Sequence, residues 1–136
     1  MDLSIIIPSF NTKALLERCI TSIISSLRDS DISHEVIVVD NASTDGSPEL
    51  LRKKYPQVQL VCNKENLGYG RANNQAMIKA KGRYVLLLNS DIVVQNDAIG
   101  KLYRVIKDKK KAFAGGKLFN VDGSSQASCG PFYTIP

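Results

Sequence analysis

Several residue types that support common enzyme chemistries are scarce in this sequence. It contains no tryptophan and a single histidine, His34, so it offers no Ser-His-Asp or Cys-His arrangement. Its cysteines are widely spaced, at Cys19, Cys62 and Cys129, with no C-x-x-C pair. This spacing argues against a zinc site or a disulfide framework and fits a reducing cytoplasm. No apolar run approaches the ~20 residues of a membrane-spanning helix. The start of the chain, Met1–Leu3, lacks the basic region of a secretory signal.

The remaining composition is that of a soluble globular domain. Among 136 residues, 43% are hydrophobic and 23% are charged, which is enough for one core of ordinary size. The net charge of +5 suits an anionic ligand or a negatively charged membrane surface. The basic clusters at 52–54 and 107–111 lie at the ends of expected helices and are not interleaved with aromatic residues. We therefore expect no nucleic-acid partner.

Short apolar runs alternate with segments of helical periodicity along most of the chain. The run Tyr84–Leu88 is unbroken, which predicts a central strand that helices bury on both faces. The expected strands are Leu3–Ile7 (ended by Pro8), Val36–Val39, Val58–Cys62, Tyr84–Leu88 and Ala112–Leu118, and the expected helices are 14–27, 47–55, 70–81 (stopped by Gly82) and one that begins after Asn96 or Asp97. This alternation predicts right-handed crossovers and an α/β fold, with a mostly parallel sheet and helices on both faces.

Turn and capping residues refine this prediction. Asn11 or Thr12 is a suitable cap for the first helix, and Ser47 is a suitable cap for the second. The pair Asp122-Gly123 predicts a hairpin turn near the end of the chain.

Polar residues follow three of the expected strands, at 8–11, 40–45 and 89–91, and the loop 63–70 should flank the same edge. In open α/β sheets, ligands bind outside the carboxyl ends of the strands. Asp40 can accept a pyrimidine N3–H or bind ribose hydroxyls, and Gly68 and Gly70 let backbone amides approach phosphates. Asp91 offers hard oxygen atoms to Mg²⁺ or Mn²⁺. Each element alone is also explained as an ordinary turn, so this interpretation depends on their combination.

Taken in order, these segments resemble family 2 glycosyltransferases. Leu3–Asn11, Val38–Ser47, Asn66–Asn74 and Leu88–Asp91 are similar to four motifs of that family. The segments 115–118 and 122–126 resemble rhamnosyltransferase-like members. The resemblance implies a Rossmann-like GT-A nucleotide-diphospho-sugar transferase fold in truncated form. It also implies a donor-binding domain at 1–118, followed at 119–136 by a hairpin that starts the acceptor side.

The resemblance also implies roles for individual residues. Asp40 would bind the nucleotide base, Asp45 would support its loop, and Asp91 would be the last acid of the metal-binding D-x-D motif. The chain has Asn89 in place of the first acid and Asn73 where many members have arginine. The expected nucleotide-sugar-binding residues are Pro8, Ser9, Asn11, Asp40, Asn41, Asp45, Gly68, Arg71, Asn74, Asn89 and Ser90, with Asp91 as the ligand of Mg²⁺ or Mn²⁺.

The implied activity is inverting transfer of a sugar from a UDP or dTDP donor to a cell-wall polysaccharide or lipid-linked acceptor. The general base is expected beyond Pro136, so no catalytic residue is assigned. A donor-binding chain without turnover is an open alternative, and a nucleotidyltransferase is a weaker one because the loop 8–11 has no glycine or basic residue. We expect a cytoplasmic location, and contact with the inner face of the membrane and homodimerisation stay open.

Overall fold

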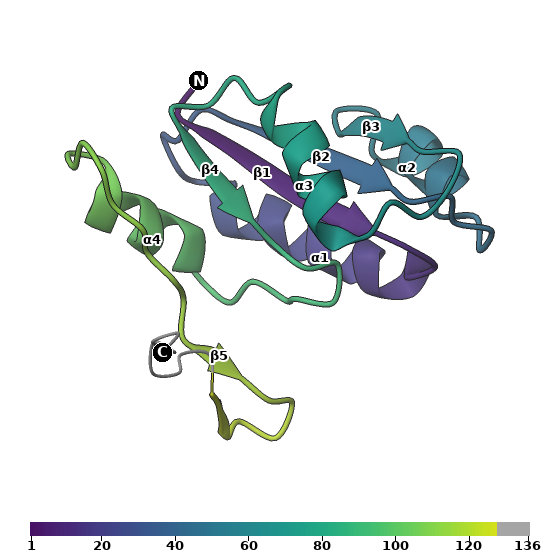
Figure 1. Cartoon of the computed structure of the whole chain (residues 1–136). Helices are drawn as coiled ribbons and strands as arrows, with labels where there is room; N and C mark the ends of the chain where they lie inside the picture. The colour runs from purple at the N-terminus through teal and green to yellow at the C-terminus, as the bar shows by residue number, and fades with distance from the viewer. Residues whose placement is uncertain (128–136) are drawn as a thin grey trace, which may run out of the picture. The chain divides into compact units, whose positions relative to one another are not determined.

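The computed structural model describes residues 1–127, which fall into two compact units. The first unit is Met1–Gly100 and the second begins at Lys101. The first contains β1 (Leu3–Ser9), α1 (Lys13–Leu27), β2 (His34–Asp40), α2 (Ser47–Lys54), β3 (Gln59–Cys62), α3 (Tyr69–Met77) and β4 (Tyr84–Leu87). Helix α4 (Ala98–Ile106) crosses the boundary, and the second unit contains β5 (Leu118–Phe119) and β6 (Ser125–Gln126). Figure 1 traces these elements along the chain.

The first unit is built on one parallel sheet with the strand order β3-β2-β1-β4. Ile5 of β1 is the register partner of Val36 in β2 and of Leu86 in β4, so β1 has a strand on each side. Because all four strands are parallel, their carboxyl ends lie at the same edge of the sheet. The α/β prediction is therefore confirmed, with helices on both faces (Figure 1).

The two faces of the sheet carry separate hydrophobic clusters. Alternate residues of a strand point to opposite faces, and β1 and β2 are buried almost throughout. Ile5 and Val38 belong to the cluster that α1 and α2 cover, together with Leu16 of α1 and Leu51 of α2. The other cluster joins Ile6, Ile37 and Val39 to Ala72 and Ala76 of α3. This two-sided burial explains why the central strands read as continuous apolar runs.

The prediction that Tyr84–Leu88 is the central strand is wrong. Strand β4 forms the edge of the described sheet, next to β1 alone. Val85 is 40% exposed and Leu87 is 43% exposed. The hydrophobic cluster beneath α3 draws its strand residues from β1, β2 and β3, so within the described residues α3 leaves this face of β4 open. The apolar run correctly indicated a strand but did not indicate its place in the sheet.

Proline at position 8 does not end the first strand, because β1 continues to Ser9. The carbonyl of Ser9 accepts from Asn41 after β2, and the carbonyl of Ile6 accepts from Leu88 after β4. Successive residues of a strand direct their hydrogen-bonding groups to alternate neighbours, so Pro8 faces the β4 side. The β1–β4 pairing ends at Ile6 and Leu87, and the missing N–H of Pro8 therefore breaks no ladder bond.

The third helix and its expected glycine stop also differ from prediction. Helix α3 ends at Met77, ahead of Gly82. A Cβ atom at Gly82 would lie 2.4 Å from the backbone nitrogen of Ser4 and 2.6 Å from the carbonyl carbon of Leu3. Glycine is needed there because the chain passes close to β1 before it enters β4, and this contact between distant segments is invisible in the local sequence.

In the second unit, the expected strand Ala112–Leu118 is wrong, since only Leu118 and Phe119 form a strand there. Gly115 and Gly116 raise the entropic cost of an extended conformation. The Asp122-Gly123 turn is confirmed, because β5 and β6 pair antiparallel and Gly123 has a φ of +84°. Among the described residues, no helix is both long enough and apolar enough to span a bilayer.

Candidate functional site

The loops at the carboxyl edge of the first unit are tied to one another by backbone hydrogen bonds. The amide of Asn41 donates to the carbonyl of Ser9 at 2.9 Å, which joins the ends of β2 and β1. The amide of Asn63 donates to the carbonyl of Asp40 at 2.8 Å, which adds the loop after β3. The expected site residues from the first two loops are thereby brought together at one edge, as the sequence predicts.

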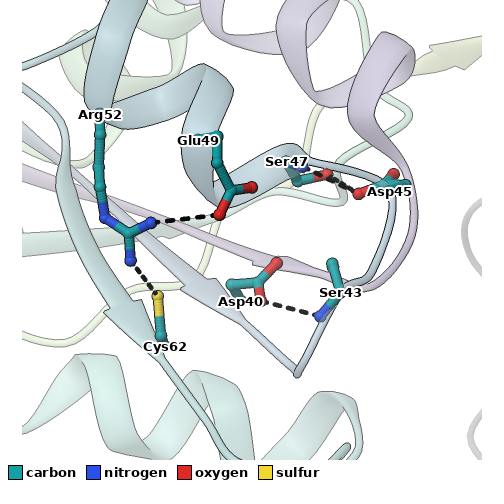
Figure 2. A network of polar contacts seen from close by, with 7 residues as sticks. All are labelled: Asp40, Ser43, Asp45, Ser47, Glu49, Arg52 and Cys62. Carbon is teal, nitrogen blue, oxygen red and sulfur yellow. Dashed lines mark hydrogen bonds and ion pairs between the residues drawn. The ribbon is translucent and has the colours of Figure 1, made fainter.

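Asp40 is the most buried charged side chain at this edge, with 2% of its surface exposed. One carboxylate oxygen, Oδ2, accepts from the amide of Ser43 at 2.9 Å, as Figure 2 shows. The other oxygen, Oδ1, is buried and has no hydrogen-bond partner among the described residues. An unsatisfied buried acceptor destabilises the fold by about 1–3 kcal/mol, so the free oxygen of Asp40 is suited to a donor supplied by a ligand.

The turn after Asp40 holds a residue in a conformation that L-amino acids rarely adopt. Ala42 has a φ of +65°, although it carries a Cβ atom. Backbone strain of this kind costs on the order of 1–3 kcal/mol and concentrates at ligand-binding sites. In this turn it lets the amide of Ser43 reach back to the carboxylate of Asp40.

Asn11 closes the first loop onto the second. It also has a left-handed backbone, with a φ of +51°. Its amide donates to Oγ of Ser43 at 2.9 Å, and its Oδ1 accepts from the amide of Thr44 at 2.8 Å. Asn11 therefore holds the second loop against the first through both its backbone and its side chain.

Asp45 joins the starts of two helices. Its Oδ2 accepts from the amide of Lys13, the first residue of α1, at 2.7 Å. Its Oδ1 accepts from the amide of Ser47 at 3.0 Å and from its hydroxyl at 2.5 Å, at the start of α2 (Figure 2). Desolvation alone would raise the pKa of Asp45, but the hydrogen bonds from Ser47 and Lys13 hold it below its usual 3.8. Asp45 supports the loop as an anion.

A chain of amide side chains, which the sequence analysis did not identify, supports the third loop. Nδ2 of Asn63 donates to Oδ1 of the buried Asn41, and Nε2 of Gln75 donates to Oδ1 of Asn63, both at 2.9 Å. These bonds connect the end of β2 to α3. Asn63 follows β3 directly, and that position was the one available signal in the sequence.

The expected residues of α3 are its N-cap, Gly68, with Arg71 in the first turn and Asn74 one turn further along the helix. Gly68 is the N-cap, and its φ of +79° is favourable only for glycine. Arg71 and Asn74 are exposed on the helix. The neighbouring Asn73 is 3% exposed, and its Nδ2 donates to the carbonyl of Tyr69 at 3.0 Å. Asn73 is therefore buried within the fold. Arg71 is the exposed cation of α3.

The segment Asn89–Asp91 lies against α1. Oγ1 of Thr12 donates to Oγ of Ser90 at 3.0 Å, and Sγ of Cys19 donates to the carbonyl of Asn89 at 3.6 Å. Burial, followed by the negative charge of Asp91, raises the pKa of Cys19 to about 12. The thiol is therefore protonated at neutral pH and remains a donor. Asn89 and Asp91 are exposed, whereas Ser90 is 9% exposed.

The donor set for a metal ion is small. Among residues 1–127, no group of three or more His, Cys, Asp or Glu side chains could hold a metal ion. Mg²⁺ is commonly bound through one or two carboxylates together with substrate phosphates. The single exposed carboxylate of Asp91 fits an ion that arrives with a phosphate ligand, and it does not fit a closed structural site.

Comparison with known proteins supports this architecture. The chain is 32% identical over 127 residues to a poly(ribitol-phosphate) beta-glucosyltransferase of Bacillus spizizenii, covering 90% of this chain and 20% of that protein. It is also 33% identical over 129 residues to a putative teichuronic acid biosynthesis glycosyltransferase, TuaG, of Bacillus subtilis, covering 89% of this chain and 49% of that protein. The chain thus corresponds to about a fifth to a half of these proteins.

Two of the solved structures that share the fold have more than a quarter of the aligned residues identical to this chain. A mannosyltransferase, PcManGT from Pyrobaculum calidifontis, was solved with GDP-Man and Mn²⁺. It has a TM-score of 0.67 and 28% identity, over 79% of this chain and 32% of that one. TarS of S. aureus, solved with UDP-GlcNAc, has a TM-score of 0.65 and 27% identity, over 80% of this chain and 32% of that one. These neighbours confirm a GT-A-like nucleotide-sugar transferase fold.

The family itself follows from a match that spans most of the chain. Residues 4–127 match the family described as Glycosyl transferase family 2. This match confirms the family resemblance seen in the four motifs of the sequence. The chain belongs to glycosyl transferase family 2.

Proposed function

We propose that the carboxyl edge of β1, β2 and β4 binds a nucleoside-diphosphate sugar. In this proposal, the whole protein transfers the sugar to a polysaccharide or lipid-linked acceptor. Family membership supports the reaction class. The neighbours solved with UDP-GlcNAc and with GDP-Man support the ligand class.

The observation that carries the proposal is the free oxygen of Asp40. It is an acceptor at the end of a buried strand, in a loop kept in shape by Asn11 and Asp45. The imide N–H of uracil or thymine is a donor of matching chemistry, and a ribose hydroxyl is another. Pro8, Ser9 and Asn41 complete the nucleoside side of the edge in this proposal, because they end or follow the same two strands.

The diphosphate is assigned to the segment Asn89–Asp91 and to α3, where Gly68 is the N-cap and the side chains of Arg71 and Asn74 are exposed. Arg71 adds a positive charge, and Asn74 adds an amide that can donate to phosphate oxygens. Asp91 would hold Mg²⁺ or Mn²⁺, with the phosphates completing the coordination. When bound, such an ion neutralises the charge that develops on the leaving diphosphate.

Finer assignments are also proposals. These are a rhamnosyltransferase-like subgroup, a UDP or dTDP donor, inversion at the anomeric carbon, peripheral contact with the inner face of the membrane from the cytoplasm, and homodimerisation. Exposed Val85 and Leu87 on β4 support a further packing surface.

The alternative function is donor binding without turnover. Transfer needs a general base that takes the proton of the acceptor hydroxyl. The carboxylates of the proposed site already have other roles: Asp40 binds the nucleoside, Asp45 supports the loop and Asp91 holds the metal ion. Measuring release of UDP from UDP-GlcNAc alongside binding separates the two functions. Binding with no UDP release favours the alternative, and acceptor-dependent release supports transfer.

The metal role of Asp91 is tested by Asp91→Asn, which keeps the shape of the side chain and removes its charge. We expect Mn²⁺ to tighten UDP binding to the native chain and to have little effect on the variant, because the segment Asn89–Asp91 contains no other charged side chain. Isothermal titration with Mn²⁺ or EDTA measures this. If UDP binding by the variant depends on Mn²⁺ as strongly as in the native chain, residues other than Asp91 hold the ion.

A further inference from the structure

Thr12 holds the N-cap position of α1 but does not cap the helix with its side chain. A threonine at this position ordinarily accepts from an amide of the first turn, and losing that bond costs about 1 kcal/mol. At the start of this helix, the carboxylate of Asp45 accepts from the amide of Lys13, the first helical residue. The hydroxyl of Thr12 is therefore free for another task.

That hydroxyl forms the centre of a three-residue chain. Oγ of Ser9 lies 2.9 Å from Oγ1 of Thr12, and Oγ1 of Thr12 donates to Oγ of Ser90 at 3.0 Å. A hydroxyl has one hydrogen to donate, so Ser9 must be the donor in the first bond. The direction of donation runs from Ser9 through Thr12 to Ser90, and the hydrogen of Ser90 is left for a further acceptor.

The chain connects two parts of the proposed site that are separated by 78 residues in sequence between Thr12 and Ser90. Ser9 ends β1 on the nucleoside side, and Ser90 precedes Asp91 on the metal side. Ser9 is 2% exposed, Ser90 is 9% exposed and Thr12 between them is half-buried, so these bonds are partly shielded from competing water. Buried hydroxyl networks of this kind restrict the geometry of the groups that they join.

The same helix holds the rest of this segment. Sγ of Cys19 donates to the carbonyl of Asn89, and Oγ of Ser22 accepts from the amide of Val94 at 2.9 Å. The sheet contributes the bond from Leu88 to Ile6. The bond from Thr12 to Ser90 is the one of these that leads directly to the first loop of the site.

We infer that Thr12 is a positioning residue that couples nucleotide binding to metal binding by fixing Ser90 and, through it, Asp91. This inference rests on the proposed function, since it assigns the nucleoside to the loop of Ser9 and the metal to Asp91. Coupling between two ligands is reciprocal, so the nucleotide and the metal strengthen each other's binding by the same factor.

The test is Thr12→Val, which keeps the branched shape and removes the hydroxyl. Thr12→Ser restores the hydroxyl. Thr21→Val is the matched control, because Thr21 also lies in α1 and its hydroxyl contacts Glu17 and Tyr55, away from this chain. The affinity for UDP is measured by isothermal titration with Mn²⁺ and with EDTA on the whole chain. Hydrogen exchange of the ligand-free protein is followed over residues 86–94.

We expect Thr12→Val to reduce the Mn²⁺-dependent gain in UDP affinity about fivefold, the effect of one lost hydrogen bond, and to leave affinity in EDTA nearly unchanged. Exchange over 86–94 should become faster. Thr12→Ser and Thr21→Val should behave as the native chain does. An unchanged metal-dependent gain in Thr12→Val overturns the inference, and so does an equal loss of affinity in EDTA, which indicates a general structural defect.

Hydrogen exchange separates failure of this inference from failure of the proposed function. If the native chain binds no nucleotide, the proposed function fails. Faster exchange in Thr12→Val alone would then still support its positioning of the segment, whereas unchanged exchange would overturn it.

Discussion

Asp40 is placed at an energetic cost that nothing in the described fold compensates. Its carboxylate is 2% exposed, yet one oxygen has no partner. The adjoining Ala42 adds backbone strain at a φ of +65°. A turn that served only to leave β2 would be more stable with a neutral residue and a glycine at these positions. The cost is explained if a ligand donor satisfies Asp40 when it binds.

Replacement of Asp40 by alanine should remove nucleotide binding and leave the fold nearly as stable as before. The variant loses the bond from Ser43, worth about 1 kcal/mol, but it also removes a buried, unsatisfied oxygen of similar cost. We expect a loss of at least tenfold in UDP affinity by isothermal titration, which corresponds to about 1.4 kcal/mol. Chemical denaturation serves as the control for folding. Native-like UDP affinity in Asp40→Ala would contradict the proposed contact between Asp40 and the nucleotide base.

Residues of the site that follow a strand could be predicted from sequence, whereas those that connect distant segments could not. Asp40, Asn89 and Asp91 stand where apolar runs stop, which is a local signal. The proposed role of Thr12 depends on a partner 78 residues away, so local capping rules assign its hydroxyl to the wrong partner. The assigned roles of the ligand-binding residues remain predictions.

At the scale of elements, Asp45 links the starts of α1 and α2 through the amides of Lys13 and Ser47. Asp45→Ala should destabilise the first unit by about 1–2 kcal/mol, because both helices lose the same acceptor. The chain contains a matched control in Asp122, which accepts from Ser124 in the same Asp-Gly-Ser geometry but has no link to a helix. Urea denaturation should show Asp122→Ala close to native. Equal effects of the two substitutions would contradict the linking role of Asp45.

A second polar cluster, at the amino-terminal edge of the sheet, makes stability depend on pH. Glu35 is 8% exposed and accepts from Oγ of Ser4 at 2.6 Å, from the amide of Lys81 at 2.7 Å and from Nε2 of Gln59 at 2.5 Å. Burial alone would raise the pKa of Glu35, but these hydrogen bonds hold it below its usual 4.5. The carboxylate therefore binds its proton more readily in the unfolded chain than in the folded one.

The resulting prediction concerns acid denaturation. The contribution of Glu35 to stability is fully present above the unfolded pKa and is lost as the pH falls through the lower folded pKa. Glu35→Gln should be less stable at pH 7, and its stability should change less between about pH 5 and pH 3 than that of the native chain. Denaturation midpoints at several pH values measure this, with Asp31→Asn at an exposed position as control. A variant with the same pH dependence as the native chain would exclude Glu35 as a cause.

The order of strands was the part of the fold that sequence patterns could not supply. Apolar runs identify β1, β2 and β4 as strands, but they do not show whether a strand lies at the edge or in the centre of the sheet. Pro8 shows the same limit, since its effect on β1 depends on where the neighbouring β4 ladder stops. Turns defined by their own residues, such as Asp122-Gly123, were predicted correctly.

For the molecule as a whole, the expected nucleotide-sugar-binding residues and Asp91 all lie within the first unit, Met1–Gly100. The proposed site therefore depends on one parallel sheet and the loops at its carboxyl edge. The predicted division at 118 and 119 into donor and acceptor parts remains a prediction. Acceptor choice and turnover remain proposals for the whole protein, because this chain covers 20% and 49% of the length of the two curated relatives named above.

The most direct test of the central claim is thermal unfolding of the chain with UDP, dTDP and GDP, each in Mn²⁺ and then in EDTA. A ligand at about 100 times its dissociation constant stabilises the folded state by about 2.7 kcal/mol. For a domain of this size, that corresponds to a rise of several degrees in Tm. We predict a rise with a pyrimidine diphosphate that is larger in Mn²⁺ than in EDTA. No rise with any of the three nucleotides would contradict donor binding at this edge.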